Sequence, residues 1–279
     1  MIHDLTNCLL GEGPMWHPER ADLFWFDIYA RRLYRHGQQW QFPFLVTAAG
    51  WVDRDTLLIA SDHALHRFDI LTGAHEPVAA LDADNPLTRS NDGRADPQGG
   101  FWIGTMGKGA PGVTGAIWRY CKGEVRRLYA PIAIPNAICF APDGTTAYFA
   151  DTHTQIIQRV RLDSDGWPLG TPEVHIDLRG TDHWPDGAVV AADGTLWNAQ
   201  WGSARVAVYD ASGQEIAAHG FAASQTTCPA FGGPDLRTLF CTSAAAGLEQ
   251  SHLAEYPQSG CTFAIATDTT GQAEHRVIL

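Results

Sequence analysis

The chain has 279 residues, of which 45% are hydrophobic and 18% are charged, and its 31 acidic against 19 basic residues give a formal net charge of −12. This is the composition of an ordinary soluble globular protein, and no apolar run is long enough to cross a membrane as a helix. The acidic balance also argues against nucleic acid and anionic membrane surfaces as partners. We expect a monomer whose partner is a small molecule.

The N-terminal stretch MIHDLTNCLLGEGP lacks the basic and long apolar regions that are typical of an export signal. The six cysteines are scattered along the chain, and no Cys-x-x-Cys pair occurs. We therefore expect a cytoplasmic protein with free thiols rather than a disulfide framework.

Six short strand-like segments share large apolar residues followed by a small or polar exit. In chain order they are LFWFD (23–27), LLIAS (57–61), FWIGT (101–105), AYFAD (147–151), LWNAQ (196–200) and LFCTS (239–243). Their second residues stand at 24, 58, 102, 148, 197 and 240, so that the spacings are 34, 44, 46, 49 and 43. These spacings are close to the roughly 40–50 residues of a four-stranded propeller blade.

Each of these segments is followed by a further β-rich run, at 31–34, 64–68, 115–120, 155–161, 204–209 and 261–266. A β-sandwich also has short strands at regular spacing, but its strands recur every 8–12 residues or so without a second, longer period. The sequence therefore predicts an all-β protein, one six-bladed β-propeller domain over residues 1–279. Either MIHDLTNCL or HRVIL is expected to close the ring as an outer strand.

Polar residues recur at the predicted start of the innermost strands. Eleven or twelve residues before the six marks stand Glu12, Val46/Thr47, Asn91, Asn136, Asp186 and Cys228. Equivalent positions of the innermost strands lie at one height around the channel of a propeller. We therefore expect the oxygen-bearing members of this set to meet at one mouth of the channel. The alternative is that Asn and Asp at strand starts bond only their own backbone, which does not account for Glu12.

Two carboxylates and an amide oxygen suit one hard or borderline divalent cation, with Ca²⁺, Mg²⁺, Mn²⁺, Zn²⁺ and Fe²⁺ as candidates. Such an ion acidifies water or polarises a carbonyl, which points to hydrolysis of an activated carbonyl compound. Arg89, two residues before Asn91, is either a substrate-binding guanidinium or an ordinary surface arginine.

The stretch WPDGAVVAADGTLW at 184–197 contains Asp-Gly twice, and the two copies are too close to be two hairpin turns. Asp193-Gly194 precedes a mark directly and is predicted to turn between the first and second strands of its blade. Asp186-Gly187 falls at the other end of that first strand, which places Asp186 in the polar ring.

Five motifs resemble the gluconolactonase and regucalcin (senescence marker protein) family of metal-dependent sugar lactonases. They are LGEGPMWHPE (10–19), RSNDGRADPQGGFWIGTM (89–106), IPNAICFAPDGTTAYFADT (134–152), WPDGAVVAADGTLWNAQW (184–201) and CPAFGGPDLRTLFCTSA (228–244). The resemblance covers nearly the whole chain, and within the family it is strongest to bacterial aldonolactonases such as xylonolactonase.

The resemblance implies a six-bladed propeller in which Glu12, Asn136 and Asp186 bind the metal ion. It also implies that Arg89 and Asn91 contact the substrate, and we take Asp186 as the catalytic residue, acting as general base unless metal-activated water serves instead. Animal members carry a substrate-contacting glutamate in the loop equivalent to 107–115, where this chain has no acidic residue.

We expect the segments 105–115, 151–155, 182–185 and 243–260 to rim the pocket, where His153, His183 and Trp184 either touch sugar or are ordinary exposed residues. The expected function is metal-dependent opening of pentono- or hexonolactones, such as D-xylono-, L-arabinono-, D-galactono- or D-glucono-lactone, to aldonic acids. The alternative is a non-catalytic, metal-binding regulatory propeller. An esterase or organophosphate hydrolase would need an apolar pocket mouth, whereas the expected rim is rich in Thr, Asp, His and Gln.

Overall fold

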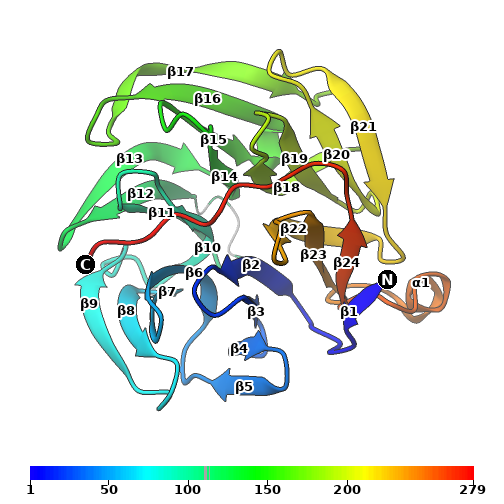
Figure 1. Ribbon diagram of the computed structural model, residues 1–279, viewed down its shortest axis with the longest axis horizontal. Coiled ribbons are helices and arrows are strands. Elements are labelled where there is room, and N and C mark those ends of the chain that lie inside the picture. The colour runs from blue at the N-terminus through cyan, green and yellow to red at the C-terminus, as the bar shows by residue number, and fades with distance from the viewer. Residues whose placement is uncertain (110–111, 113) are drawn as a thin grey trace.

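Six four-stranded antiparallel sheets are arranged around one axis as a six-bladed β-propeller (Figure 1). The structure, a computed structural model, describes residues 1–109, 112 and 114–279. The fold predicted from the repeat is confirmed, since each of the six marks lies in the second strand of its blade.

The first three blades follow the chain in order. Blade 1 is β2 (Gly11–His17), β3 (Asp22–Asp27), β4 (Arg32–Arg35) and β5 (Gln38–Gln41). Blade 2 is β6 (Val46–Asp53), β7 (Thr56–Ser61), β8 (Ala64–Asp69) and β9 (His75–Ala80). Blade 3 is β10 (Thr88–Ala95), β11 (Phe101–Gly107), β12 (Gly115–Cys121) and β13 (Glu124–Ile132).

The second half of the ring repeats this arrangement. Blade 4 is β14 (Pro135–Phe140), β15 (Thr146–Asp151), β16 (Ile156–Leu162) and β17 (Pro168–Asp177). Blade 5 is β18 (Trp184–Val190), β19 (Leu196–Trp201), β20 (Arg205–Tyr209) and β21 (Glu215–Gly220). Blade 6 is β22 (Gln225–Gly232), β23 (Thr238–Ala244), β24 (Thr262–Ala266) and β1 (Ile2–Asp4).

The ring is closed by the N-terminal segment. β1 pairs with β24 as the outer strand of blade 6, with Ile2 opposite Phe263. The alternative, that HRVIL supplies this strand, is wrong, because the C-terminal residues leave the sheet and cross the face of the ring (Figure 1). Strands from both ends of the chain therefore lie in one sheet, which leaves no gap between the first and last blades.

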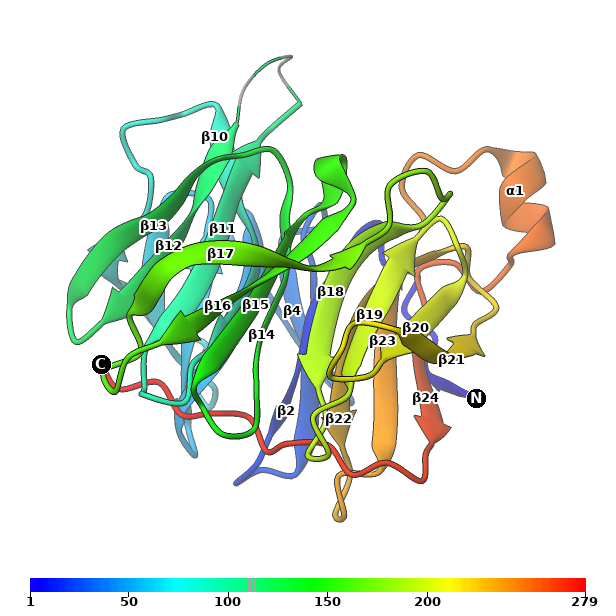
Figure 2. The same ribbon diagram turned by 90° about the horizontal axis from the view of Figure 1, so that it is seen from above.

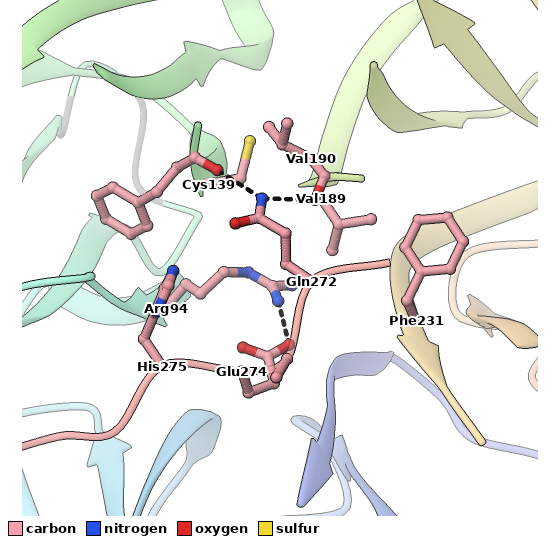
Figure 3. Close-up of a pocket in the computed structure, with 10 residues that line it drawn as sticks. Arg94, Cys139, Val189, Val190, Phe231, Gln272, Glu274 and His275 are labelled. Atoms are coloured by element: carbon pink, nitrogen blue, oxygen red, sulfur yellow. Dashed lines mark hydrogen bonds and ion pairs between the residues drawn. The ribbon is translucent and has the colours of Figure 1, made fainter. Parts of the chain in front are cut away.

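The C-terminal segment crosses the lower face of the ring, opposite the face that carries the short helix α1 (Gln250–Glu255) (Figure 2). Gln272 Nε2 donates to the carbonyl oxygens of Phe140 and Val190 at 3.0 and 2.8 Å. Glu274 forms an ion pair with Arg94 of β10 (Figure 3). These contacts join the segment to blades 3, 4 and 5, so that it covers the lower mouth of the channel.

Large apolar side chains of the second strands fill the space between blades. Phe24, Leu58 and Trp102 at the marks are fully buried, and Trp197 is 3% exposed. These mark residues are therefore part of the core between blades. Helical structure is confined to η1 (Thr152–Thr154) and α1, so the part of the chain that the structure describes has no helix able to span a membrane.

Candidate active site

A cavity of about 430 Å³ opens at the upper mouth of the channel. Its polar floor is formed by Glu12 of β2, Asn91 of β10, Asn136 of β14 and Asp186 of β18. Four innermost strands each contribute one of these side chains, and all four are at most 8% exposed. The structure thus brings together residues up to 174 positions apart (186 − 12), as the counting of blades predicted.

The two remaining ring positions do not reach this cavity. Thr47 is buried and donates from Oγ1 to Ser90 Oγ at 2.9 Å. Cys228 lines a small void farther down the channel, together with Asp92 and Arg94. The oxygen-bearing side chains are therefore gathered on the side of blades 1, 3, 4 and 5.

Every innermost strand carries a register irregularity at its ring residue. The pairing register shifts between Glu12 and Met15 in β2 and between Asn136 and Cys139 in β14. The register of the other four innermost strands shifts at the equivalent positions. After Asn136 the chain passes through a left-handed Ala137, with φ of 54°. A bulge redirects a side chain relative to the ladder, so these bulges aim the floor residues at the axis. Strand alternation in the sequence does not reveal them.

The two Asp-Gly pairs of blade 5 have different structural roles. Gly194, with φ of 87°, is the left-handed residue of the β18–β19 turn, where Asp193 Oδ1 accepts from the backbone N–H of Thr195 at 3.0 Å. Gly187 has no such φ, but a Cβ on it would lie 2.3 Å from Cys228 Sγ and 2.9 Å from Cys228 Cα. The predicted positions of both pairs are confirmed. Gly187, the glycine after Asp186, allows blades 5 and 6 to pack closely.

Gly187→Ala is expected to lower the free energy of unfolding by about 1–3 kcal/mol, because the new methyl group overpacks β18 against β22. Denaturation in urea measures the change. Combining it with Cys228→Gly, which removes the opposing side chain, is expected to cost less than the sum of the two single changes. Additive costs would show that the methyl group does not meet Cys228.

Two aspartates at strand ends hold the segments that lead into the floor residues. Asp27, the last residue of β3, accepts the backbone N–H groups of Leu9 and Leu10 at 2.8 and 3.2 Å. Asp151, the last residue of β15, accepts those of Ala133 and Ile134 at 2.8 and 3.0 Å. In each case the two bonded residues stand three and two positions before the floor residue, Glu12 or Asn136, so both segments are held in the same way. In the sequence, these aspartates are the polar exits of the segments LFWFD and AYFAD.

Hydrogen bonds link the floor across blades. Arg89 Nη1 donates to Asn91 Oδ1 at 2.8 Å, and Asn91 Nδ2 donates to Asn136 Oδ1 at 3.0 Å. Asn136 Nδ2 donates to the Thr152 hydroxyl at 2.8 Å, which in turn donates to the carbonyl oxygen of Pro185 at 2.6 Å. Both amide orientations are thereby set, with the oxygen of Asn136 directed toward blade 3 rather than toward Thr152.

The carboxyl groups of the floor are strongly perturbed. Burial, and next the negative charge of Asp92, raise the pKa of Glu12 to about 8. Burial and the charges of Glu12 and Asp92 raise the pKa of Asp186 well above its usual range, although Arg89 opposes the shift. Converging buried acids favour a bound cation, since positive charge between them would offset both burial and repulsion.

The donor set fits a divalent cation of the kind that prefers oxygen. Glu12, Asp186 and Asn136 present carboxylate and amide oxygens, which suit Ca²⁺, Mg²⁺ or Mn²⁺ and are accepted by Zn²⁺ and Fe²⁺. Over the described ranges no three His, Cys, Asp or Glu side chains gather as a metal cluster, and the amide oxygen of Asn136 lies in the same floor as the two carboxylates.

Comparison with known proteins agrees with the motifs. The profile of the SMP-30/Gluconolactonase/LRE-like region matches residues 10–245. The chain belongs to this family. A Rhizobium meliloti protein assigned as a sugar lactone lactonase is 40% identical over 272 residues, which is 95% of this chain and 92% of the relative. The L-arabinolactonase of Azospirillum brasilense is 34% identical over 284 residues, covering 97% and 93% of the two chains.

A crystal structure from Agrobacterium tumefaciens, described as the calcium-binding protein regucalcin, is similar over the whole chain. It is 42% identical, covers 100% of this chain and 97% of its own, and superposes with a TM-score of 0.97. Family members thus carry names of two kinds, lactonase and calcium-binding protein, and these correspond to the two functions that the sequence left open.

Other predicted contacts lie away from the cavity. His153 is exposed on η1, and His183 Nδ1 is hydrogen bonded to Ser203 Oγ at 3.0 Å. Trp184 is 40% exposed, and none of the three lines the cavity, so their contact with sugar stays a prediction. In the loop 107–115, Ala110, Pro111 and Val113 lie outside the described residues.

The prediction of a polar rim is wrong for the walls of the cavity. Above the floor the walls are an apolar collar, which we define as Leu10, Tyr29, Met106, Ile134, Trp201 and Ala246. The expected rim segments supply four of the residues that line the cavity: Met106, Thr152, Ala246 and Gly247. The expectation failed because Asp151 accepts backbone N–H groups and His153 is exposed, while apolar residues of the same segments, such as Met106 and Ala246, face the cavity.

Proposed function

We propose that the protein is a divalent-metal-dependent sugar lactonase that hydrolyses aldonolactones to aldonic acids. The observation that carries the proposal is the buried floor of two carboxylates and two amides, with the Arg89 guanidinium beside it, at the base of one open cavity. The relatives named as lactonases support the same reaction class.

We assign the metal ion to Glu12, Asn136 and Asp186, whose oxygens come from three blades and share one floor. A divalent ion held there supplies Lewis-acid activation of a carbonyl group and of water. The backbone N–H of Gly13 donates to Glu12 Oε2 at 3.0 Å, which orients that carboxylate without using its second oxygen.

Arg89 and Asn91 are proposed to hold the lactone. The guanidinium is buried at 6% exposure, and its Nη1 bonds to Asn91 Oδ1 and to the Ser90 carbonyl oxygen, both at 2.8 Å. Burial lowers the pKa of Arg89, and the nearby Tyr29, Glu12 and Asp186 act in the opposite direction. An arginine side chain stays protonated in proteins. A fixed positive charge beside the carbonyl group stabilises the negative charge that develops on its oxygen during hydrolysis.

Asp186 is proposed to act as the general base. It accepts a proton from the attacking water as the new carbon–oxygen bond forms at the lactone carbonyl carbon. The bond from that carbon to the ring oxygen then breaks, and the ring oxygen takes the proton to become the hydroxyl group of the aldonic acid. Next to Asp186, Gly187 lets β18 approach Cys228 of β22 more closely than a side chain would allow.

The competing function is a regulatory propeller that binds the ion without turnover, and the name of the Agrobacterium protein favours considering it. Simple ion binding gives no role to a buried arginine beside the floor, whereas a carbonyl substrate does. Assay of a panel of pentono- and hexonolactones decides between the two. Failure to accelerate any of them would leave the regulatory function.

Removal of the metal is expected to abolish lactone hydrolysis and to lower the melting temperature, because Glu12 and Asp186 are then left facing each other. Chelated protein is dialysed, supplied with single divalent metals, and followed by acid release and by thermal melting. Glu12→Gln serves as the matched variant, which is expected to bind metal more weakly in calorimetry. Unchanged melting and full activity after chelation would contradict the metal assignment.

A further inference from the structure

The innermost strands present a second layer of residues above the floor. Side chains two apart on an extended segment face the same way, so a residue two before a ring position is placed to line the same mouth. Leu10, Arg89 and Ile134 line the cavity in this way, whereas Leu45, Trp184 and Thr226 do not. Of the three that do, Arg89 alone is charged. Together with the other members of the collar, Leu10 and Ile134 make the walls above the floor largely apolar.

Packing and backbone hydrogen bonds hold the residues of this layer in place. Leu10 is 8% exposed and packs with Ile28 and Ala244 in a small apolar cluster, against which Leu45 and Trp201 also pack. The backbone of Leu10 is held by Asp27, and that of Ile134 by Asp151. The collar walls from blades 1 and 4 are thus fixed in position before any ligand arrives.

Few polar groups of the collar are available to a ligand. The Thr152 hydroxyl below it already donates to Pro185 and accepts from Asn136. The phenol of Tyr29 lies beside the Arg89 guanidinium, and Trp201 offers one indole N–H. A hydroxyl group placed against Leu10, Met106 or Ile134 would lose its water without gaining a partner.

The exocyclic chain of an aldonolactone is carried on the far side of the ring oxygen from the carbonyl carbon. With the carbonyl group at Arg89 and Asn91, that chain is directed away from the floor and toward the collar. We propose, on the basis of the proposed lactonase function, that the preferred substrates are 6-deoxyhexonolactones, whose chain ends in a methyl group that the collar buries. The corresponding hexonolactones end in a hydroxymethyl group and are disfavoured.

The test compares substrates that differ by one oxygen atom. L-Fucono- and L-galactono-1,4-lactone form one such pair, and L-rhamnono- and L-mannono-1,4-lactone form a second with different stereochemistry. With the metal-loaded protein we expect kcat/KM to be about 10- to 100-fold higher for the deoxy member of at least one pair, the range in which an apolar pocket discriminates.

Ile134 provides a matched pair of variants, since valine and threonine have nearly the same shape. Ile134→Thr places a hydroxyl group in the collar, and Ile134→Val makes nearly the same change in size without one. The preference for the deoxy lactone is expected to fall several-fold in the threonine variant relative to the valine variant.

Equal or faster hydrolysis of the hydroxymethyl lactone in both pairs would overturn the inference and leave the lactonase function standing. An identical preference in the two Ile134 variants would overturn the role of the collar. Absence of hydrolysis for all four lactones, together with the panel above, would instead overturn the lactonase function and the inference with it.

Discussion

Asp186→Asn is expected to reduce kcat/KM for lactone hydrolysis by about 10²- to 10⁴-fold, the usual contribution of a general base. The amide keeps the shape of the side chain and cannot accept a proton from water. It also removes one of the two converging negative charges, so the affinity for the metal ion is expected to fall in the same variant. Steady-state kinetics at saturating metal and calorimetric titration measure the two effects separately.

The chain supplies its own control in the second Asp-Gly pair. Asp193→Asn makes the same substitution at an aspartate that also precedes a glycine, seven residues along the chain. Asp193 is exposed and bonds only within its turn, where asparagine makes the same bond. The free energy of unfolding of the Asp193→Asn variant is expected to stay within about 0.5 kcal/mol of the parent value, and its kinetics are expected to be unchanged. If Asp186→Asn retains full activity at saturating metal, the catalytic role is wrong.

Glu274→Gln is expected to lower the free energy of unfolding by about 3–5 kcal/mol, because it leaves the buried Arg94 without its counter-charge. The two side chains are 10% and 13% exposed, respectively, at the lower mouth of the channel (Figure 3). Burial lowers the pKa of Arg94 and Glu274 raises it. Since an arginine side chain stays protonated in proteins, the variant leaves a buried positive charge without this partner. Urea denaturation followed by fluorescence measures the change.

The exposed pair between Arg126 and Glu124 is the control, since both side chains are more than half exposed. Glu124→Gln is expected to change stability by less than about 1 kcal/mol. Replacing both partners, as Arg94→Met with Glu274→Leu, is expected to recover much of the loss, since no unpaired charge remains. A cost for Glu274→Gln as small as that of Glu124→Gln would show that the C-terminal segment does not hold the lower mouth.

The repeat predicted the blades because each blade imposes the same requirement on one short run of its own sequence. Each second strand is buried on both faces between neighbouring blades, so it needs a run of large apolar residues such as Phe24 or Trp102. That requirement recurs once per blade, and counting back from it gave Glu12, Asn91, Asn136 and Asp186. The count also separated Asp186 from Asp193, which the dipeptide alone does not.

Other parts of the site have causes that are distant in sequence. The bulges at Glu12 and Asn136 depend on how two strands pair, and the single-residue pattern does not record pairing. Gly187 is small because Cys228 of the next blade lies against it. The choice between the two termini for the outer strand of blade 6 likewise depended on hydrogen bonds to β24.

The sequence by itself determined the number of blades and the four residues of the floor, because these repeat at a fixed count from buried strands, and its motifs indicated the family. Only the tertiary structure decided that the cavity walls are apolar and that Arg94 and Glu274 join the C-terminal segment to the channel. Both depend on which side chains from separate blades face one space, and a residue's own neighbours in the chain do not determine that.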